Sequence, residues 1–218
     1  MSIDHIVWDW NGTLFGDSVA LIEYTIEAFR ASGLPVVTRE LYQQHHTQPI
    51  PLFYDRLAGR ELSEDEQLVL AGHFQTAYGQ RRDTIPLTRD ALASLTRWQE
   101  TGRSQSLLSM YPHDELIPLV HKAGITDYFA AVDGLRDGER GRKAPHLRRQ
   151  LNELGLDPAT VLLVGDSVDD AVAARECGTG FRLYHAGADA LHARDHFAGV
   201  SIVDTLGEAV DGALSGTQ

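Results

Sequence analysis

Carboxylates follow two apolar segments of this sequence, a pattern that predicts a metal site. Asp9 lies near the end of the apolar segment 3–10, and Asp166 follows the apolar segment 160–164. Asp169 and Asp170 fall in the first turn of the helix expected after Asp166, where the helix dipole favours anions. Two like charges about 4 Å apart still repel by about 4 kcal/mol at an effective dielectric constant near 20. A bound cation would relieve this repulsion, and oxygen ligands with open water positions suit Mg²⁺.

Two further residues could bind a phosphoryl group beside these carboxylates. The chain has only two lysines, Lys122 and Lys143, and Lys143 precedes a predicted helix. Its charge would hold Asp9 ionised and bind a phosphoryl oxygen, although an isolated lysine is more often a solvated surface residue. Ser109 ends a predicted strand, where its hydroxyl and the following N–H of Met110 can hold oxygens as charge develops in a transition state.

Short apolar segments alternate with amphipathic ones along most of the chain, which predicts a parallel sheet covered by helices. Strands are expected at residues 3–10, 106–110, 129–132, 160–164, 180–184 and 200–203, and helices at 86–101, 113–123, 144–154 and 168–177. Ligands bind such sheets at the carboxyl ends of the strands, which is where Asp9, Ser109 and Asp166 fall. The expected fold class is therefore α/β, with a Rossmann-like doubly wound parallel sheet as its core.

One stretch, residues 16–85, interrupts this alternation. It has helical patterns at 19–31, 39–45, 52–57 and 64–82 and no evident strand, and Ser63 with Glu66 reads as a capping box for the last of them. So long a stretch without a strand exceeds an ordinary loop and must carry its own packing. We expect an inserted all-helical cap domain of residues 16–85 on a core of residues 1–15 and 86–218.

Composition and charge place the chain among ordinary globular proteins. Its 218 residues, 43% of them hydrophobic, suffice for one domain and a smaller insertion. A formal net charge of -12 argues against nucleic acid or an anionic membrane as partner. Cys177 is the only cysteine, the N-terminus lacks the basic segment of a signal peptide, and no stretch approaches the roughly 18 apolar residues of a membrane helix. We expect a cytoplasmic protein, and the sequence gives no oligomeric state.

The chemistry-bearing residues resemble, in their order, the four motifs of the haloacid dehalogenase (HAD) superfamily: Asp9, Ser109, Lys143, and Asp166 with Asp170. The first motif usually reads Asp-x-Asp-Gly-Thr and here reads Asp9-Trp10-Asn11-Gly12-Thr13. Segments 124–129 and 155–158, together with a helical insertion after the first motif, resemble the phosphoglycolate-phosphatase-like branch with a helical cap of subclass I. The resemblance implies a Mg²⁺-dependent phosphatase.

The resemblance also implies a role for each matching residue. Asp9 would attack phosphorus and form an aspartyl-phosphate. The transferring phosphoryl group would be bound by Ser109, the N–H of Met110 and Lys143. The metal would be held by Asp9, the backbone carbonyl of Asn11 and Asp166, with Asp170 in support. The substrate would be a small phosphate monoester enclosed by the cap.

Asn11 stands where the family has an aspartate that protonates the leaving alcohol and activates the hydrolytic water. An asparagine has no ionisable proton at neutral pH, and loss of general acid–base catalysis costs about 10²- to 10⁴-fold in rate. We therefore expect slow turnover, or a substitute proton donor among His113, His45 and His46, each of which could equally be a surface or capping residue. The alternative is a phosphometabolite-binding or regulatory protein that keeps the site without the acid.

Two related chemistries of the family fit less well. A phosphonatase forms a Schiff base with a cap lysine, and residues 16–89 contain no lysine. A haloacid dehalogenase needs no metal, which leaves the acidic segment 165–170 unexplained.

Substrate identity would depend on the cap. Residues 47–51 have the composition of a loop that could face the site. Arg56 could meet a substrate carboxylate or a second phosphate, or could lie in solvent on a helix.

Overall fold

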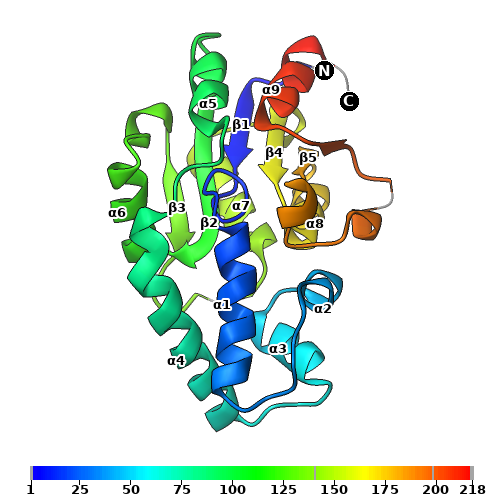
Figure 1. Ribbon diagram of the computed structural model, residues 1–218. Helices are drawn as coiled ribbons and strands as arrows, with labels where there is room; N and C mark the ends of the chain where they lie inside the picture. Colours follow the sequence, from blue (N-terminus) through cyan, green and yellow to red (C-terminus); the bar gives the residue numbers. More distant parts are fainter. Residues whose placement is uncertain (1, 140, 198, 217–218) are drawn as a thin grey trace.

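A six-stranded parallel sheet forms the centre of the molecule in the computed structural model, which describes residues 2–139, 141–197 and 199–216 (Figure 1). Its strands follow the order β3-β2-β1-β4-β5-β6. Their bounds are β1 (His5–Trp8), β2 (Ser104–Pro112), β3 (Val132–Leu135), β4 (Val161–Gly165), β5 (Gly180–Tyr184) and β6 (Ile202–Val203). With helices on both faces, the expected α/β, Rossmann-like class is confirmed.

β1 occupies the middle of the sheet, which explains its unbroken burial. All four of its residues are buried, and it pairs in parallel with β2 on one side and β4 on the other. Trp8 lies opposite Val164, and the N–H of Asp9 donates to the Val164 carbonyl at 2.9 Å. The carboxyl ends of β1 and β4 therefore lie side by side, which brings Asp9 next to the residues that follow Gly165.

Alternate strand residues bury against different helices. Ile6, Trp8 and Val164 belong to a core shared with α5 (Ala91–Gln99), α6 (His113–Lys122) and α9 (Leu206–Ser215). Val7 and Leu163 point the other way, toward α7 (Lys143–Glu153) and α8 (Val168–Cys177). This period of two follows from the pleat of a strand, and it fixes both helical layers against a rigid sheet.

The stretch between β1 and α5 forms four helices beyond the carboxyl edge of the sheet (Figure 1). They are α1 (Ser18–Ala31), α2 (Arg39–His45), α3 (Ile50–Ala58) and α4 (Glu64–Arg81). Phe29, Tyr42, Phe53 and Leu70 belong to an apolar cluster of their own, which Leu191 from the loop after β5 joins. Ser63 and Glu66 form the expected capping box at the start of α4. The division into a cap of residues 16–85 and a core stays a prediction.

The third strand lies later in the chain than the pattern of apolar residues predicts. We expected it at residues 129–132, whereas β3 runs over Val132–Leu135 and Phe129 follows a 3-10 turn. Asp133 and Gly134 belong to residue types that are uncommon in strands, so the sequence pattern does not predict a strand at these positions. Gln150 donates to the Asp133 carboxylate at 3.2 Å, and a Cβ on Gly134 would lie 2.5 Å from the carbonyl oxygen of Tyr111. Contacts with other parts of the fold, rather than strand propensity, therefore account for an aspartate and a glycine at these positions.

Two further elements differ from expectation. The helix predicted at 86–101 begins only at Ala91, because the preceding residues cross the loop after β1: Leu87 bridges Phe15, and the N–H of Thr88 donates to the Leu14 carbonyl at 2.8 Å. α9 closes the fold at the C-terminal end and was not anticipated. Within the described residues, none of the helices is long and apolar enough to cross a membrane.

Candidate active site

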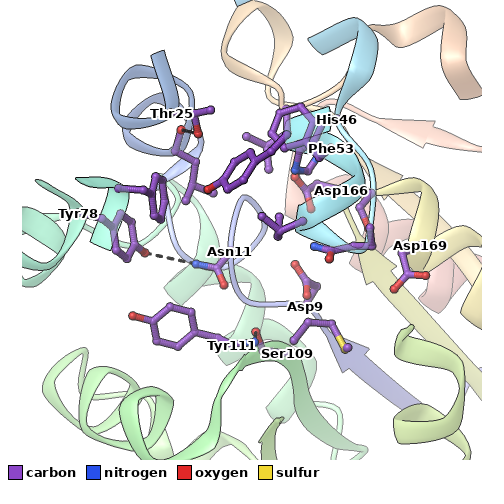
Figure 2. Close-up of a pocket in the computed structure, with 18 of the residues that line it drawn as sticks. Asp9, Asn11, Thr25, His46, Phe53, Tyr78, Ser109, Tyr111, Asp166 and Asp169 are labelled. Carbon is purple, nitrogen blue, oxygen red and sulfur yellow. Dashed lines mark hydrogen bonds between the residues drawn. The ribbon is translucent and has the colours of Figure 1, made fainter. Parts of the chain in front are cut away.

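A cavity of about 380 Å³ lies between the carboxyl edge of the sheet and the helices α1–α4 (Figure 2). On the sheet side it is lined by six residues that the sequence singled out: Asp9, Asn11, Ser109, Met110, Lys143 and Asp166. Asp170 lies behind them, 1% exposed, in contact with Lys143. The fold thus gathers residues from four separate segments of the chain around one cavity.

The loop after β1 turns sharply enough to aim Asp9 and Asn11 into this cavity. The ring of Trp10 stacks on Phe15 with centroids 4.8 Å apart, and the N–H of Phe15 donates to the Trp10 carbonyl at 2.8 Å. Gly12 has a φ of 74°, in the left-handed region that favours glycine. A Cβ on Gly12 would also collide with the Asp166 carboxylate. Conformation and close approach therefore both require a glycine here.

Three buried carboxylates, those of Asp9, Asp166 and Asp170, each place an oxygen within 4.8 Å of the others. Burial raises the pKa of Asp9 to about 7, with Lys143 opposing and Asp170 reinforcing the shift. Burial, reinforced by Asp9 and Asp170, also raises the pKa of Asp166 well above its usual range. The Oδ2 atom of Asp166 is buried without a hydrogen-bond partner in the described part of the chain.

Lys143 is the first residue of α7 and is almost completely buried beneath the site. Its backbone N–H donates to the Asp169 carboxylate at 2.8 Å, which fixes the start of the helix. Its ammonium nitrogen donates to both Asp9 and Asp170 in short ion pairs. Burial disfavours the charged ammonium, but Asp170 and Asp9 outweigh this effect and raise the pKa of Lys143. The ammonium therefore stays charged at every physiological pH.

Asp170 uses one carboxylate oxygen to cap the start of α8 and the other to position Lys143. One oxygen accepts the hydroxyl of Ser167 at 2.6 Å and the N–H of Ser167 at 3.0 Å, in a capping box at the start of α8. The other accepts the Lys143 ammonium. A Cβ on Gly165 would lie 2.5 Å from the Asp170 carboxyl carbon, so that glycine keeps Asp170 in place.

Negative charge exceeds positive charge at this site. Asp9, Asp166 and Asp170 face one ammonium, and Asp169 adds a further carboxylate to the cavity wall. Lys143 is the one lysine or arginine among the described residues that line the cavity. Hard carboxylate oxygens, one of them without a donor, are the ligand type that divalent cations such as Mg²⁺ prefer. The donor set therefore fits such a cation.

Ser109 lies within β2 rather than at its end, at a place where the strand pairing is irregular. The register of β2 against β3 shifts between Leu108 and Pro112. Within this irregular stretch, the Oγ atom of Ser109 accepts the N–H of Tyr111 at 3.0 Å. As an acceptor in that bond, the Ser109 hydroxyl keeps its own hydrogen for donation toward the cavity.

Asn11 is held by two residues that sequence reasoning missed, Asp17 and Tyr78. The Asn11 amide donates to Asp17 at 2.6 Å and lies 3.4 Å from the Tyr78 hydroxyl (Figure 2). Tyr78 and the N–H of Gly12 also donate to Asp17, at 2.7 and 2.8 Å. Burial raises the pKa of Asp17 to about 6, and these hydrogen bonds oppose the shift. Only the tertiary structure brings Tyr78, on α4, to this turn.

The three candidate proton donors have different surroundings. His46 lines the cavity, and its Nδ1 atom lies 3.0 Å from Nε2 of His192. Burial lowers the pKa of His46 to about 4, so that its ring is neutral at pH 7. The Nδ1 atom of His113 accepts the N–H of Gly134 at 3.2 Å, and neither His113 nor His45 is among the described lining residues. His46 alone of the three reaches the site.

Comparisons with known proteins agree with this architecture. The family model described as haloacid dehalogenase-like hydrolase matches residues 3–178. A phosphoglycolate phosphatase from Yersinia pestis is 29% identical over 189 residues, covering 81% of this chain and 78% of the relative. Another from Agrobacterium fabrum is 30% identical over 182 residues, covering 78% and 75%. The chain therefore belongs to the haloacid dehalogenase-like hydrolase family.

Solved structures share the fold at lower sequence identity. A haloacid dehalogenase-like family protein from Streptococcus pneumoniae superposes with a TM-score of 0.79 at 17% identity, covering 96% of this chain and 97% of its own. A HAD-superfamily hydrolase from Ehrlichia chaffeensis gives a TM-score of 0.63 at 18% identity, covering 99% and 98%. The fold thus extends over the helical insertion as well as the sheet.

The close approach of Gly12 to Asp166 can be tested with Gly12→Ala, for which Gly33→Ala is the control. Both glycines have a positive φ, but a Cβ on Gly33 would meet no atom within 4 Å. We expect Gly12→Ala and Gly33→Ala each to lower the free energy of unfolding by about 1 to 2 kcal/mol from backbone strain. We expect Mg²⁺ to raise the thermal stability of the wild type, and Gly12→Ala, which should in addition displace Asp166, to lose this stabilisation. Equal Mg²⁺ stabilisation of both variants, measured by calorimetry, would contradict this placement of the cation.

Proposed function

We propose that the protein is a Mg²⁺-dependent phosphatase that hydrolyses a small phosphate monoester through an aspartyl-phosphate on Asp9. The observation that carries the proposal is the buried excess of carboxylate over ammonium at the edge of the sheet. Membership of the hydrolase family and the resemblance to phosphoglycolate phosphatases support it. On this proposal the site transfers a phosphoryl group first to the protein and then to water.

Mg²⁺ would be held by Asp9, the backbone carbonyl of Asn11 and Asp166, with Asp170 in support. Asp166 offers a buried oxygen without a donor, whereas Lys143 and Ser167 occupy both oxygens of Asp170. When bound, the cation offsets negative charge on the phosphoryl oxygens and on the carboxylates around them. This arrangement leaves Asp170 to position Lys143.

Asp9 is the proposed nucleophile. A carboxylate oxygen of Asp9 forms a bond to phosphorus while the bond from phosphorus to the leaving oxygen breaks. Water then attacks phosphorus, the bond to Asp9 breaks, and inorganic phosphate leaves with Asp9 restored. Lys143 favours the ionised form of Asp9 that the first step needs, since its ammonium contacts the Asp9 carboxylate directly and opposes the effect of burial on the Asp9 pKa.

The phosphoryl group would be bound by Ser109, the N–H of Met110 and Lys143. Ser109 and Met110 lie in the irregular part of β2 that lines the cavity, and Lys143 reaches it from α7. These donors come from rigid elements, so they need no rearrangement as charge develops on the phosphoryl oxygens. The helices of residues 16–85 would act as the cap that encloses the substrate.

Asn11 limits proton transfer within this mechanism. Its amide donates to Asp17 and carries no ionisable proton, so it cannot protonate a leaving alcohol. Poor leaving groups should therefore be turned over slowly. A phosphometabolite-binding or regulatory protein without turnover is the second candidate; Asn11 alone points to it, whereas the similarity to phosphoglycolate phosphatases supports the enzyme.

Release of inorganic phosphate tests the proposal. We expect the wild type with Mg²⁺ to hydrolyse members of a panel of phosphate monoesters, and Asp9→Asn to lose at least about 10³-fold in kcat, because a neutral amide cannot attack phosphorus. Chelation of Mg²⁺ should remove the activity as well. Tight binding of the same esters by calorimetry without any phosphate release would contradict the phosphatase and favour the binding protein.

Asn11→Asp tests the assigned defect. The introduced carboxyl would face Asp17 across the present 2.6 Å contact, and two carboxyls at that distance hold one proton between them. We expect hydrolysis of alkyl phosphates to rise by about 10²-fold, and that of aryl phosphates to change little, since aryl leaving groups need no proton. If alkyl phosphate turnover does not rise, Asn11 is not the limiting residue.

A further inference from the structure

Much of the cavity wall is aromatic. The helices and β2 contribute a ring-rich wall: Tyr42, Phe53, Tyr54, Phe74, Tyr78 and Tyr111. Phe74 stacks on Tyr78 with ring centroids 5.5 Å apart. Phe53 lies across the cavity from Asp9 and Ser109 (Figure 2). A leaving group attached to a phosphoryl group at Asp9 would therefore extend into an aromatic compartment, and at about 380 Å³ the cavity suits a small ring.

This compartment offers no positive charge for an anionic leaving group. Lys143 is the one lysine or arginine on the described cavity wall, and it is already paired with Asp9 and Asp170. Arg56, which could have met a substrate carboxylate, is exposed and lies outside the described lining.

Arg82 and His46 lie near the ring-rich wall, but neither supplies a positive charge for the leaving group. The Arg82 guanidinium, near Tyr111, pairs with Glu115 and donates to the Tyr111 hydroxyl at 2.6 Å. His46 is neutral at pH 7 because burial lowers its pKa to about 4. A carboxylate on the leaving group would thus enter a cavity that already holds Asp9 and Asp166, without a counterion.

Asn11 limits the leaving group independently of charge. Asn11 cannot protonate the leaving oxygen, and departure of that oxygen as an anion favours alcohols that are themselves acidic. A phenol such as the tyrosine side chain has a pKa of about 10, far below that of an alkyl alcohol. An aromatic compartment and a missing acid therefore favour the same class of leaving group.

We infer that the substrate is a small aryl phosphate, the phosphate monoester of an uncharged aromatic alcohol, with its ring in the compartment lined by Phe53, Phe74 and Tyr78. The inference rests on the proposed phosphatase and narrows its substrate. A substrate of this kind differs from one, such as phosphoglycolate, whose leaving group carries a carboxylate.

Four substrates with Mg²⁺ test the inference: phenyl phosphate, 4-carboxyphenyl phosphate, benzyl phosphate and phosphoglycolate. We expect phenyl phosphate to exceed 4-carboxyphenyl phosphate by at least about tenfold in kcat/KM, because the added carboxylate stays unpaired. Benzyl phosphate, with a similar ring but an alkyl leaving group, should show a similar KM and a kcat lower by about 10²-fold. Phosphoglycolate should be the poorest of the four.

Two variants that each add one positive charge on α4 provide a matched comparison. Gln75 and Gln80 are both exposed on this helix, but only Gln75 is among the described residues that line the cavity. Gln75→Arg should reduce the preference for phenyl over 4-carboxyphenyl phosphate several-fold, and Gln80→Arg, with the same change in net charge, should leave the ratio unchanged.

The outcomes separate the inference from the proposed function. Hydrolysis of 4-carboxyphenyl phosphate or phosphoglycolate as efficiently as phenyl phosphate overturns the inference and leaves the phosphatase intact. Benzyl phosphate turned over as fast as phenyl phosphate overturns the leaving-group argument, since a proton donor must then act. No hydrolysis of any of the four overturns the inference, whereas the phosphatase is contradicted only if the wider panel of phosphate monoesters releases no phosphate either.

Discussion

One buried ammonium facing three buried carboxylates is the constraint on which the site depends. Lys143 contacts Asp9 and Asp170 directly, yet burial still raises the pKa of Asp9 to about 7 and that of Asp166 well above its usual range. Isolated buried charges of this kind are unfavourable, and a protein retains them where a ligand completes the balance. The excess negative charge therefore supports the proposed cation, accounts for the buried position of Lys143 and underlies the inferred preference for an uncharged leaving group.

The topology of the sheet creates this constraint. β1 and β4 are neighbours in the middle of the sheet, so their carboxyl ends place Asp9 beside Asp166, and α7 and α8 begin close to that edge. Gly12 and Gly165 then allow backbone and carboxylates to approach more closely than any side chain would permit. The helical insertion covers the same edge with rings rather than charges. On the proposed function, the residues at the sheet edge would carry out the chemistry and the helical insertion would set the specificity.

Much of this arrangement could be predicted from the sequence, and the remainder could not for identifiable reasons. The segments containing Asp9, Ser109, Lys143 and Asp166 are local patterns whose order along the chain predicts a shared edge, and the fold does bring them to one cavity. β3 was misplaced because Asp133 and Gly134 are chosen by contacts with Gln150 and Tyr111 rather than by strand propensity. Asp17 and Tyr78 lie 61 residues apart, and no local pattern links them to Asn11. The aromatic wall likewise becomes apparent only after the helices have packed.

The number of protons released when Mg²⁺ binds reports directly on whether the buried carboxyls hold the cation. Titration calorimetry at pH 7 in two buffers of different ionisation enthalpy counts the protons displaced per bound ion. Burial raises the pKa of Asp9 to about 7 and that of Asp166 well above its usual range. The assignment of these two carboxyls as ligands therefore predicts one Mg²⁺ site whose occupation releases protons, and a smaller release in Asp166→Asn. Failure of Mg²⁺ to bind, or binding without proton release, would contradict it.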